Sequence, residues 1–388
     1  MRSGLIVVYH LSLQLPFAGI IWQLLHHLIG FRRLGLDVYY VEDSGGGWVY
    51  DAVAETFVSD PTRNLALVTS ALNRHGFEGR WAFRDPESGE YLGLSKAACR
   101  QLIRDADAVI NLCGALDPGE EHANTRCLVY VGTDPGQFQV ELQQRVPKAV
   151  RCANAHKLLF TYAYNLGSAD CLLPTGGLQW KPTRPPVLLE YWADFADRPD
   201  SGAFTSIGTW RNKGRDIEIN GELHSWSKHV NFLKMLEVPE RSSQEIELAT
   251  DLRGGSDYEQ MNSAGFKIRS AIPMSLDLDE YRNYIGSSRG EFTVAKDVVA
   301  RTGSGWFSDR SACYLAAGRP VVTQCTGFER TLPTGVGLCC FDTAEEAADA
   351  IRSVNSDYAR HSRAAREIAS EYFDATKVLR EIIEAAGL

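Results

Sequence analysis

The sequence predicts an α/β protein built from two domains, each a doubly wound parallel sheet with helices on its faces. Three observations support this fold class. The 388 residues are too many for one ordinary hydrophobic core. Short apolar runs alternate with amphipathic stretches along most of the chain. A proline-rich stretch near the middle interrupts this alternation, which then resumes.

The first half of the chain has the pattern of strands alternating with helices. Residues 5–9 form a continuous apolar run, which is typical of a strand buried in a parallel sheet. Apolar side chains then recur on one helical face, at Phe17, Ile21, Leu24, Leu28 and Phe31. Further buried strands are predicted at residues 38–41, 108–112, 127–131 and 158–162. We therefore expect an N-terminal domain over residues 1–180.

The second half repeats the pattern after a connector. Residues 181–202 contain four prolines, Pro182, Pro185, Pro186 and Pro199, which indicate a linker. Strands are then predicted at residues 204–207, 245–250, 292–295 and 320–323, with helices between them. We expect a C-terminal domain over residues 203–360 and closing helices over residues 361–388.

Composition excludes several classes of protein. The net charge of -9 argues against a nucleic-acid-binding surface. No run reaches the roughly 18–20 apolar residues of a membrane span, so we expect a cytoplasmic protein without a membrane segment. The nine cysteines include no C-x-x-C pair, which favours reduced structural thiols and no metal site.

The most informative segment is residues 303–322, where a glycine loop, a short helix, Gly318, Pro320 and a buried strand follow one another. The loop begins Gly303-Ser304-Gly305-Trp306 and leads into Ser308, Asp309 and Arg310 at the predicted start of the helix. The free N–H groups and the positive dipole end of a helix N-terminus favour anions. Small residues allow a diphosphate to approach the backbone.

This segment resembles the donor half of GT-B glycosyltransferases, in which such a loop and helix hold a nucleotide diphosphate and the helix ends in A-x-G-x-P-V-V. Residues 315–322 match that ending closely, and Gly305, Trp306 and Ser308 are similar to the glycine-Trp-x-Ser of one large subgroup. Two positions differ from that subgroup. Its His before the glycine is Ser304 here, and its ribose-binding Glu is Cys313, with Asp309 as a possible substitute.

The resemblance implies two facing Rossmann-like domains and a C-terminal helix that crosses back onto the N-terminal domain. It implies a hexosyltransferase that moves a sugar from a nucleotide-diphosphate sugar, held mainly by residues 208–330, to a hydroxyl of a small-molecule or glycan acceptor. The nucleotide sugar is a co-substrate, and neither a metal nor another cofactor is expected.

The same resemblance suggests the donor-binding side chains. The cationic turn of Arg211 and Lys213 would stabilise the departing diphosphate. Glu291 would accept hydrogen bonds from sugar hydroxyls, Lys296 would neutralise phosphate, and Gln324 would contact the sugar. The complete predicted donor site is Arg211, Lys213, Glu291, Lys296, Gly303, Gly305, Trp306, Ser308, Asp309, Arg310 and Gln324.

On the acceptor side, His10 follows the first predicted strand. Its ordinary pKa near 6.5 suits removal of a proton from an acceptor hydroxyl. Asp43 and Asp134 end two other predicted strands, and either carboxylate would orient His10 or act as the base instead.

Two other interpretations remain. The first is an NAD(P)-dependent oxidoreductase, since a strand, a helix and a second strand ending in Glu42 and Asp43 fit a dinucleotide-binding unit. However, residues 11–19 lack G-x-G-x-x-G, and Pro16 and Phe17 would crowd a pyrophosphate. The second is a non-catalytic GT-B relative or a sugar-nucleotide epimerase of the same fold.

Overall fold

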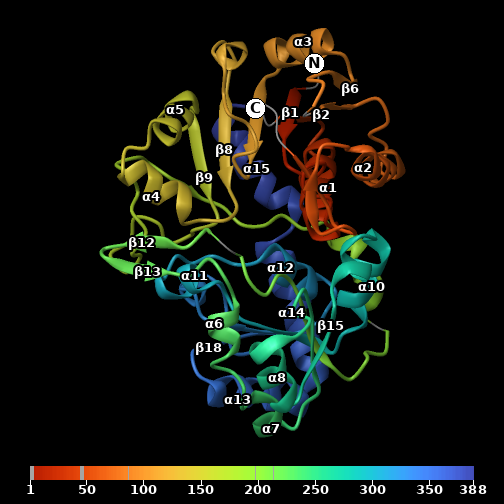
Figure 1. Ribbon diagram of the computed structural model, residues 1–388, viewed down its shortest axis with the longest axis vertical. Helices are drawn as coiled ribbons and strands as arrows, with labels where there is room; N and C mark the ends of the chain where they lie inside the picture. The colour runs from red at the N-terminus through yellow and green to blue at the C-terminus, as the bar shows by residue number, and fades with distance from the viewer. Residues whose placement is uncertain (1–3, 44–47, 86, 197, 213) are drawn as a thin grey trace.

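The computed structural model describes residues 4–43, 48–85, 87–196, 198–212 and 214–388. Two sheet-containing domains lie one above the other, with the N-terminal half of the chain in one and most of the C-terminal half in the other (Figure 1). The two-domain α/β architecture predicted from the alternating pattern is confirmed.

The N-terminal sheet has eight strands in the order β10-β9-β8-β7-β1-β2-β5-β6. All neighbours pair in parallel except β5 and β6, which are antiparallel. Register is fixed at the centre, where Val7 of β1 lies between Tyr39 of β2 and Val109 of β7. The strands are β1 (Leu5–Tyr9), β2 (Asp37–Glu42), β5 (Trp81–Arg84), β6 (Tyr91–Gly93), β7 (Ala108–Leu112), β8 (Leu128–Gly132), β9 (Leu158–Thr161) and β10 (Lys181–Pro182).

Helices and a small hairpin flank this sheet. The helices are α1 (Ala18–Arg33), α2 (Thr62–Arg74), α3 (Lys96–Asp105), α4 (Gln137–Gln143) and α5 (Pro147–Ala155). The hairpin is β3 (Val49–Asp51) and β4 (Thr56–Val58), and the turn η1 covers Glu120–His122. Helix α1 forms because its apolar positions recur at helical spacing, and most of its residues are buried.

The C-terminal sheet is entirely parallel, in the order β15-β14-β11-β16-β17-β18. Numbered within the domain, this is the 3-2-1-4-5-6 order of a doubly wound sheet, and ligands of such sheets bind outside the carboxyl ends of the strands where the winding reverses. Here that point lies between β11 and β16. The strands are β11 (Phe204–Ile207), β14 (Ile246–Thr250), β15 (Phe266–Ser270), β16 (Gly290–Thr293), β17 (Val321–Gln324) and β18 (Leu338–Phe341).

The rest of the chain contains the remaining helices and a hairpin, β12 (Ile217–Ile219) with β13 (Glu222–His224). The helices are α6 (His229–Phe232), α7 (Val238–Ser242), α8 (Gly255–Ser263), α9 (Ile272–Ser275), α10 (Leu278–Ser287), α11 (Asp297–Arg301), α12 (Asp309–Ala316), α13 (Ala344–Ser356), α14 (Tyr358–Tyr372) and α15 (Ala375–Ala386). Short turns are η2 (Leu189–Tyr191), η3 (Ala193–Phe195) and η4 (Phe328–Arg330).

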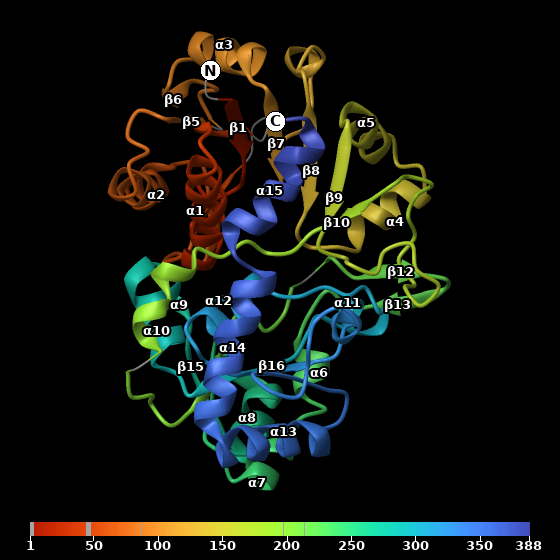
Figure 2. The same cartoon turned by 180° about the vertical axis from the view of Figure 1, so that it is seen from behind.

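The chain crosses between the domains twice, and the two crossings are hydrogen-bonded to each other. Val187 N donates to Phe373 O at 2.7 Å, and Ala375 N donates to Val187 O at 3.0 Å. Beyond this point α15 packs on α1 of the first domain (Figure 2). The helices approach closely because residue 30 is glycine: a Cβ there would lie 2.4 Å from Leu379 Cδ1.

The return of the chain begins later than the sequence indicated. Helix α14 packs on α12 and β18 of the second domain, so only the part after residue 373 reaches the first domain. At the other crossing, Lys181 and Pro182 pair with β9, so the connector begins after residue 182.

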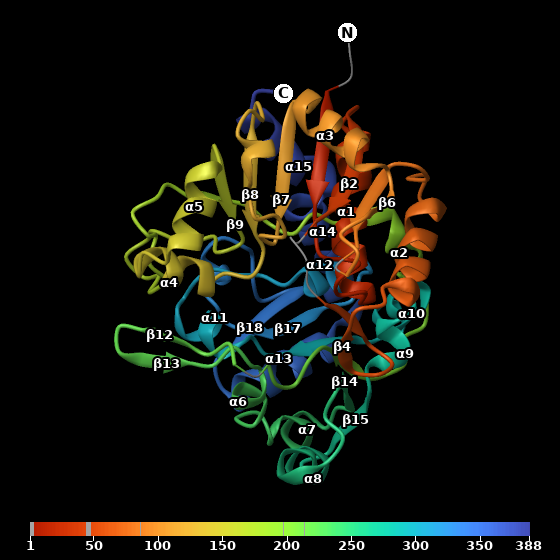
Figure 3. The ribbon, with the colours of Figure 1, turned by 45° about the horizontal axis from the view of Figure 1, so that its top comes forward.

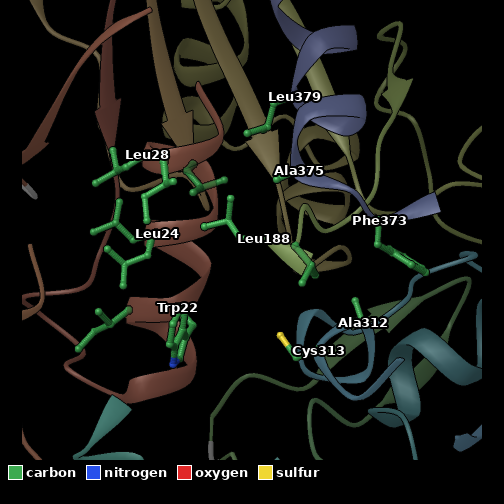
Figure 4. Packing of buried hydrophobic residues seen from close by; sticks show 14 of the residues in the cluster. Trp22, Leu24, Leu28, Leu188, Ala312, Cys313, Phe373, Ala375 and Leu379 are labelled. Atoms are coloured by element: carbon green, nitrogen blue, oxygen red, sulfur yellow. The ribbon is translucent and has the colours of Figure 1, made fainter. Parts of the chain in front are cut away.

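A shared hydrophobic core joins the domains. Figure 4 shows side chains of α1, the first crossing, α12 and α15 meeting in this layer, among them Trp22, Leu188, Cys313 and Leu379. Cys313 is buried here, with Sγ 3.7 Å from Nε2 of His26. The side chain at position 313, where the glycosyltransferase subgroup has its ribose-binding Glu, therefore packs against α1 in this protein. Among the described residues, no helix combines the length and apolar character that a membrane crossing requires.

Candidate active site

A cavity of about 680 Å³ lies between the domains. The carboxyl ends of the N-terminal strands point toward the second domain (Figure 3), so the loops after β1, β7 and β8 form one wall. The second domain provides the facing wall. Among the lining residues are His10, Thr133, Asp134, Arg215, Trp226, Lys296, Trp306 and Asp309.

Two contacts join the walls of this cavity. The ammonium group of Lys296 forms an ion pair with the carboxylate of Asp134 and lies 4.5 Å from the ring centroid of Trp226. Trp306 Nε1 donates a hydrogen bond to Thr133 O at 2.9 Å. Lys296 and Asp134 were predicted to act on opposite substrates, and the structure places them in contact.

The glycine loop before α12 packs against the loop that follows β9. Gly305 has a φ of 76°, and a Cβ there would lie 2.8 Å from Cγ of Asn165. Gly305 N donates to Thr326 O at 2.7 Å, while Asn165 Nδ2 donates to Gly303 O at 3.1 Å. These glycines therefore allow close packing of chain segments, and the amide of Gly305 already has a partner.

A small recess lies at the first turn of α12. Within the described chain, the side chain of the N-cap residue Ser308 makes no capping hydrogen bond. The N–H groups of this turn are thus left for another acceptor. The lining residues include Lys228, Thr293, Ser308, Arg310, Gln324 and Trp306, and Trp306 also borders the large cavity.

Arg310 and Glu291 form the floor beside this recess, where the winding of the sheet reverses. Arg310 Nε donates to Glu291 Oε1 at 2.6 Å, and its Nη1 donates to Ile207 O at 2.7 Å. Glu291 is fully buried, and its Oε2 has no hydrogen-bond partner in the part of the chain that is described. An unpaired buried carboxylate oxygen is costly, so it favours a donor supplied by a ligand.

A chain of polar side chains runs from the first domain into α12. His10 Nδ1 lies 2.8 Å from Ser12 Oγ, and His10 Nε2 lies 2.9 Å from Gln23 Oε1. The side chain of Gln23 in turn favours the charged form of the Asp309 carboxylate, and both residues line the cavity. Burial lowers the pKa of His10 to about 4, and burial raises the pKa of Asp309 to about 6.

Comparisons with known proteins agree with this geometry. No known protein family and no curated protein matches the sequence. Solved structures do match: an alpha-glucosyltransferase in complex with UDP and DNA has a TM-score of 0.57 at 13% identity, with 100% of each chain covered. HepE of Anabaena in complex with UDP has a TM-score of 0.56 at 15% identity, covering 99% of this chain and 100% of that one. AviGT4, a glycosyltransferase of avilamycin A biosynthesis, has a TM-score of 0.53 at 11% identity, covering 98% and 96%.

This chain has the GT-B fold. The predicted fold is thereby confirmed, and the cavity is the cleft between the two GT-B domains. Several predicted residues line that cleft or the recess beside it: His10, Asp134, Lys296, Trp306, Ser308, Asp309, Arg310 and Gln324. Their predicted roles stay predictions.

Other predicted residues lie elsewhere in the GT-B framework. Arg211 pairs with Asp257 at 2.6 Å in a separate depression, beside residues 251–256. Lys213 lies outside the described residues. Asp43 accepts a hydrogen bond from Tyr91 Oη at 2.5 Å and pairs with Arg84 at 3.3 Å. None of the described atoms of Asp43 lines the cleft.

Glu42, the other acid at the end of β2, holds the loop after β1. Its carboxylate accepts hydrogen bonds from Leu13 N at 2.7 Å and Gln14 N at 2.6 Å, and also from the hydroxyl of Tyr40. Burial raises the pKa of Glu42 to about 7. In a dinucleotide-binding unit this acid would hold ribose. Here it is occupied by the protein backbone.

Sequence reasoning missed Lys228 and Gln23. Lys228 lies between the recess and the turn at Gly208, and burial together with the charge of Arg310 holds its pKa well below the ordinary value. Among the described residues it forms no ion pair. One lysine before a short helix has no distinctive pattern. The signal for Gln23 was its interruption of an apolar helical face.

One group of metal-binding side-chain types occurs outside the cleft. The ligand atoms of Cys325, Glu329 and Cys340 all lie within 4.8 Å of one another, and the three residues are half-buried. No local sequence pattern predicts this grouping, because Cys325 follows β17 whereas Cys340 lies in the neighbouring strand β18. The expectation that the protein needs no metal stays a prediction.

Proposed function

We propose that the protein is a glycosyltransferase that moves a sugar from a nucleotide-diphosphate sugar to a hydroxyl of a small-molecule or glycan acceptor. The observation that carries this proposal is the half-buried Lys228 beside the uncapped first turn of α12, next to the interdomain cleft. A helix N-terminus and an unpaired ammonium group together favour a bound diphosphate.

The neighbouring structures support this choice of ligand. HepE is known in complex with UDP, with UDP and glucose, and with UDP-glucose. The alpha-glucosyltransferase binds UDP together with DNA. A diphosphate bound in the recess would provide a negative charge beside the ammonium group of Lys228. Burial lowers the pKa of Lys228, and this negative charge would raise the pKa again by stabilising the charged ammonium group.

The residues around the recess then have separate tasks. Lys228 and the N–H groups of α12 would stabilise the negative charge that develops on the departing diphosphate, which is an electrostatic contribution. The free Oε2 of Glu291 would accept a hydrogen bond from the nucleotide sugar. The acceptor would enter from the N-terminal side, where Tyr130 and Phe138 stack with their ring centroids 4.7 Å apart beside the cavity.

The test is ligand binding followed by turnover. We expect UDP or a UDP-sugar to raise the melting temperature and NADH to leave it unchanged. Lys228→Ala should weaken binding of the nucleotide at least about tenfold, because one charge-assisted contact contributes about 1.5–3 kcal/mol. The control is Lys234→Ala, because Lys234 is exposed and its ammonium group hydrogen-bonds Asn231 in its own turn.

Each alternative has its own outcome. Stabilisation by NADH alone would support an oxidoreductase and refute the transferase. Binding of a nucleotide sugar without transfer to any acceptor or to water would support a non-catalytic relative. Equal nucleotide affinity in Lys228→Ala and wild type would show that the recess is not the diphosphate site.

A further inference from the structure

The polar chain Ser12–His10–Gln23–Asp309 has a definite direction. With the side chain of Gln23 in this orientation, its Oε1 accepts a hydrogen bond from the thiol of Cys113 at 3.2 Å. His10 Nε2, 2.9 Å from the same atom, must then carry its proton in order to donate to it. The amide nitrogen is the remaining donor of Gln23, and this side chain favours the charged form of the Asp309 carboxylate.

This direction fixes the state of His10. With the proton on Nε2, the other ring nitrogen is the acceptor, and the hydroxyl of Ser12 donates to it over 2.8 Å. Both nitrogens are therefore used within the protein, and the ring is only 1% exposed. A general base needs a free lone pair within reach of the substrate hydroxyl. The hydrogen bonding of His10 thus opposes its predicted role as the base.

Unlike the ring of His10, the carboxylate of Asp309 is placed where it can reach a substrate. Its carboxylate borders the large cavity, while its backbone opens α12, whose first turn borders the recess for the diphosphate. It therefore lies between the two places that the donor and the acceptor would occupy. Among the other acids of the cleft, Asp134 is already paired with Lys296.

Resting on the proposed function, we infer that Asp309 is the catalytic base of the transfer and that Ser12, His10 and Gln23 are positioning residues that hold its carboxylate. The proton of the acceptor hydroxyl moves to a carboxylate oxygen of Asp309. The acceptor oxygen forms the new bond to the anomeric carbon. The bond from that carbon to the diphosphate breaks, and its electron pair leaves with the diphosphate. The anomeric configuration is inverted.

The electrostatics of the site suit this role. Burial raises the pKa of Asp309 to about 6, while the hydrogen bond from Gln23 and the charge of Arg310 act in the opposite direction and Asp134 adds to the rise. Cys113, Tyr162 and Cys313 also lie close enough to interact with Asp309, and burial raises the pKa of each, so they are uncharged. A base is most effective when its pKa lies near the working pH.

The first experiment measures kcat and donor affinity in Asp309→Asn. We expect kcat to fall about 10²- to 10⁴-fold while the affinity for the nucleotide sugar stays within a few-fold. Asp279→Asn is the matched control, because Asp279 also lies in the first turn of a helix but is exposed and remote from the cleft. In Asp309→Ala, added formate should restore part of the rate by supplying a carboxylate.

The second experiment tests positioning. Removing the hydrogen bond in Gln23→Met should raise the pKa of Asp309, because that bond favours the charged carboxylate. The acidic limb of the pH–kcat profile should then move to higher pH. A purely structural role of Gln23 would lower the folded fraction and leave the limb in place.

The outcomes separate this inference from the proposed function. Transfer by wild type combined with near-wild-type kcat in Asp309→Asn, or a product with retained anomeric configuration, would refute the base and leave the transferase intact. Failure of wild type to transfer from any nucleotide sugar would refute the proposed function itself.

Discussion

At the scale of single residues, the sequence predicted the segment of the donor site better than the individual contacts. Ser308, Asp309 and Arg310 were found because glycine, helix start and strand follow one another in a recognisable order. Their tasks depend on side chains from other parts of the chain. Arg310 is held by Glu291, and Gln23 favours the charged form of Asp309; neither contact follows from a local pattern.

At Gly305, too, the motif and the structure give different reasons for the glycine. The motif predicts that the small size of Gly305 lets a diphosphate approach the backbone. In the structure a Cβ at residue 305 meets Asn165 at 2.8 Å with φ at 76°. Even Gly305→Ala should therefore destabilise the protein, by about 2–5 kcal/mol from backbone strain and overpacking together.

Chemical denaturation measures this change. The matched control is Gly177→Ala, which has a similar φ of 77° and nothing within 4 Å of the added Cβ. The control should cost only the strain, about 1–2 kcal/mol. Equal losses in the two variants would show that Asn165 moves aside easily.

At the scale of helices and strands, the alternating pattern located most elements, because burial on both faces gives strands continuous apolar runs. It did not locate the return of the chain, since α13, α14 and α15 are all amphipathic and their sequences do not say which domain each covers. Their partners decide this, and the decisive one is Gly30 in α1, whose missing side chain admits Leu379.

Helix α1 also makes the fold sensitive to acid. His26 Nδ1 accepts a hydrogen bond from Leu188 N at 3.1 Å, which ties the helix to the first crossing. Burial lowers the pKa of His26 to about 3. The unfolded chain takes up this proton below about pH 6.5 and the folded chain does not until about pH 3. The contribution of neutral His26 to the free energy of unfolding is therefore fully present above pH 6.5 and is lost as the pH falls toward 3.

The free energy of unfolding as a function of pH tests this. His26→Gln should flatten the decline between about pH 6 and 4 by up to about 1.4 kcal/mol per pH unit, which is the linkage of one proton. His10 and His27, whose pKa values burial lowers to about 4, add to the decline in both proteins. Glu42 works against it, since its folded pKa is raised to about 7. An unchanged slope in His26→Gln would exclude this histidine as a contributor.

At the scale of the whole molecule, the two domains share one core and should unfold together. Side chains from α1, the first crossing, α12 and α15 belong to a single buried cluster. Arg319, also buried, donates to the carbonyl oxygens of Gly286 at 2.8 Å and Phe195 at 2.9 Å, which fixes the first crossing to the second domain. The length and linker in the sequence indicated two domains but could not show how much core they share.

Hydrogen exchange of the amides in β1 and β11 tests this cooperativity. Leu379→Ala in the shared core should lower the opening free energy of both strands by the same amount, about 2–5 kcal/mol. Ile351→Ala, in a cluster confined to the second domain, should also lower both equally if the domains open as one unit. A loss limited to β11 in the Ile351 variant would show that the second domain opens by itself.

The paired crossings at residues 187 and 373–375 have a mechanical consequence. Because Val187 bonds to both Phe373 and Ala375, the two crossings form one double connection between the domains, and any relative motion of the domains must bend both together. Opening the cleft for a substrate would then separate Asp134 from Lys296 and Thr133 from Trp306. The ion pair is only partly screened from water, and exposed pairs contribute about 0–1 kcal/mol. A ligand that contacts both walls would therefore lose little binding energy by breaking this ion pair.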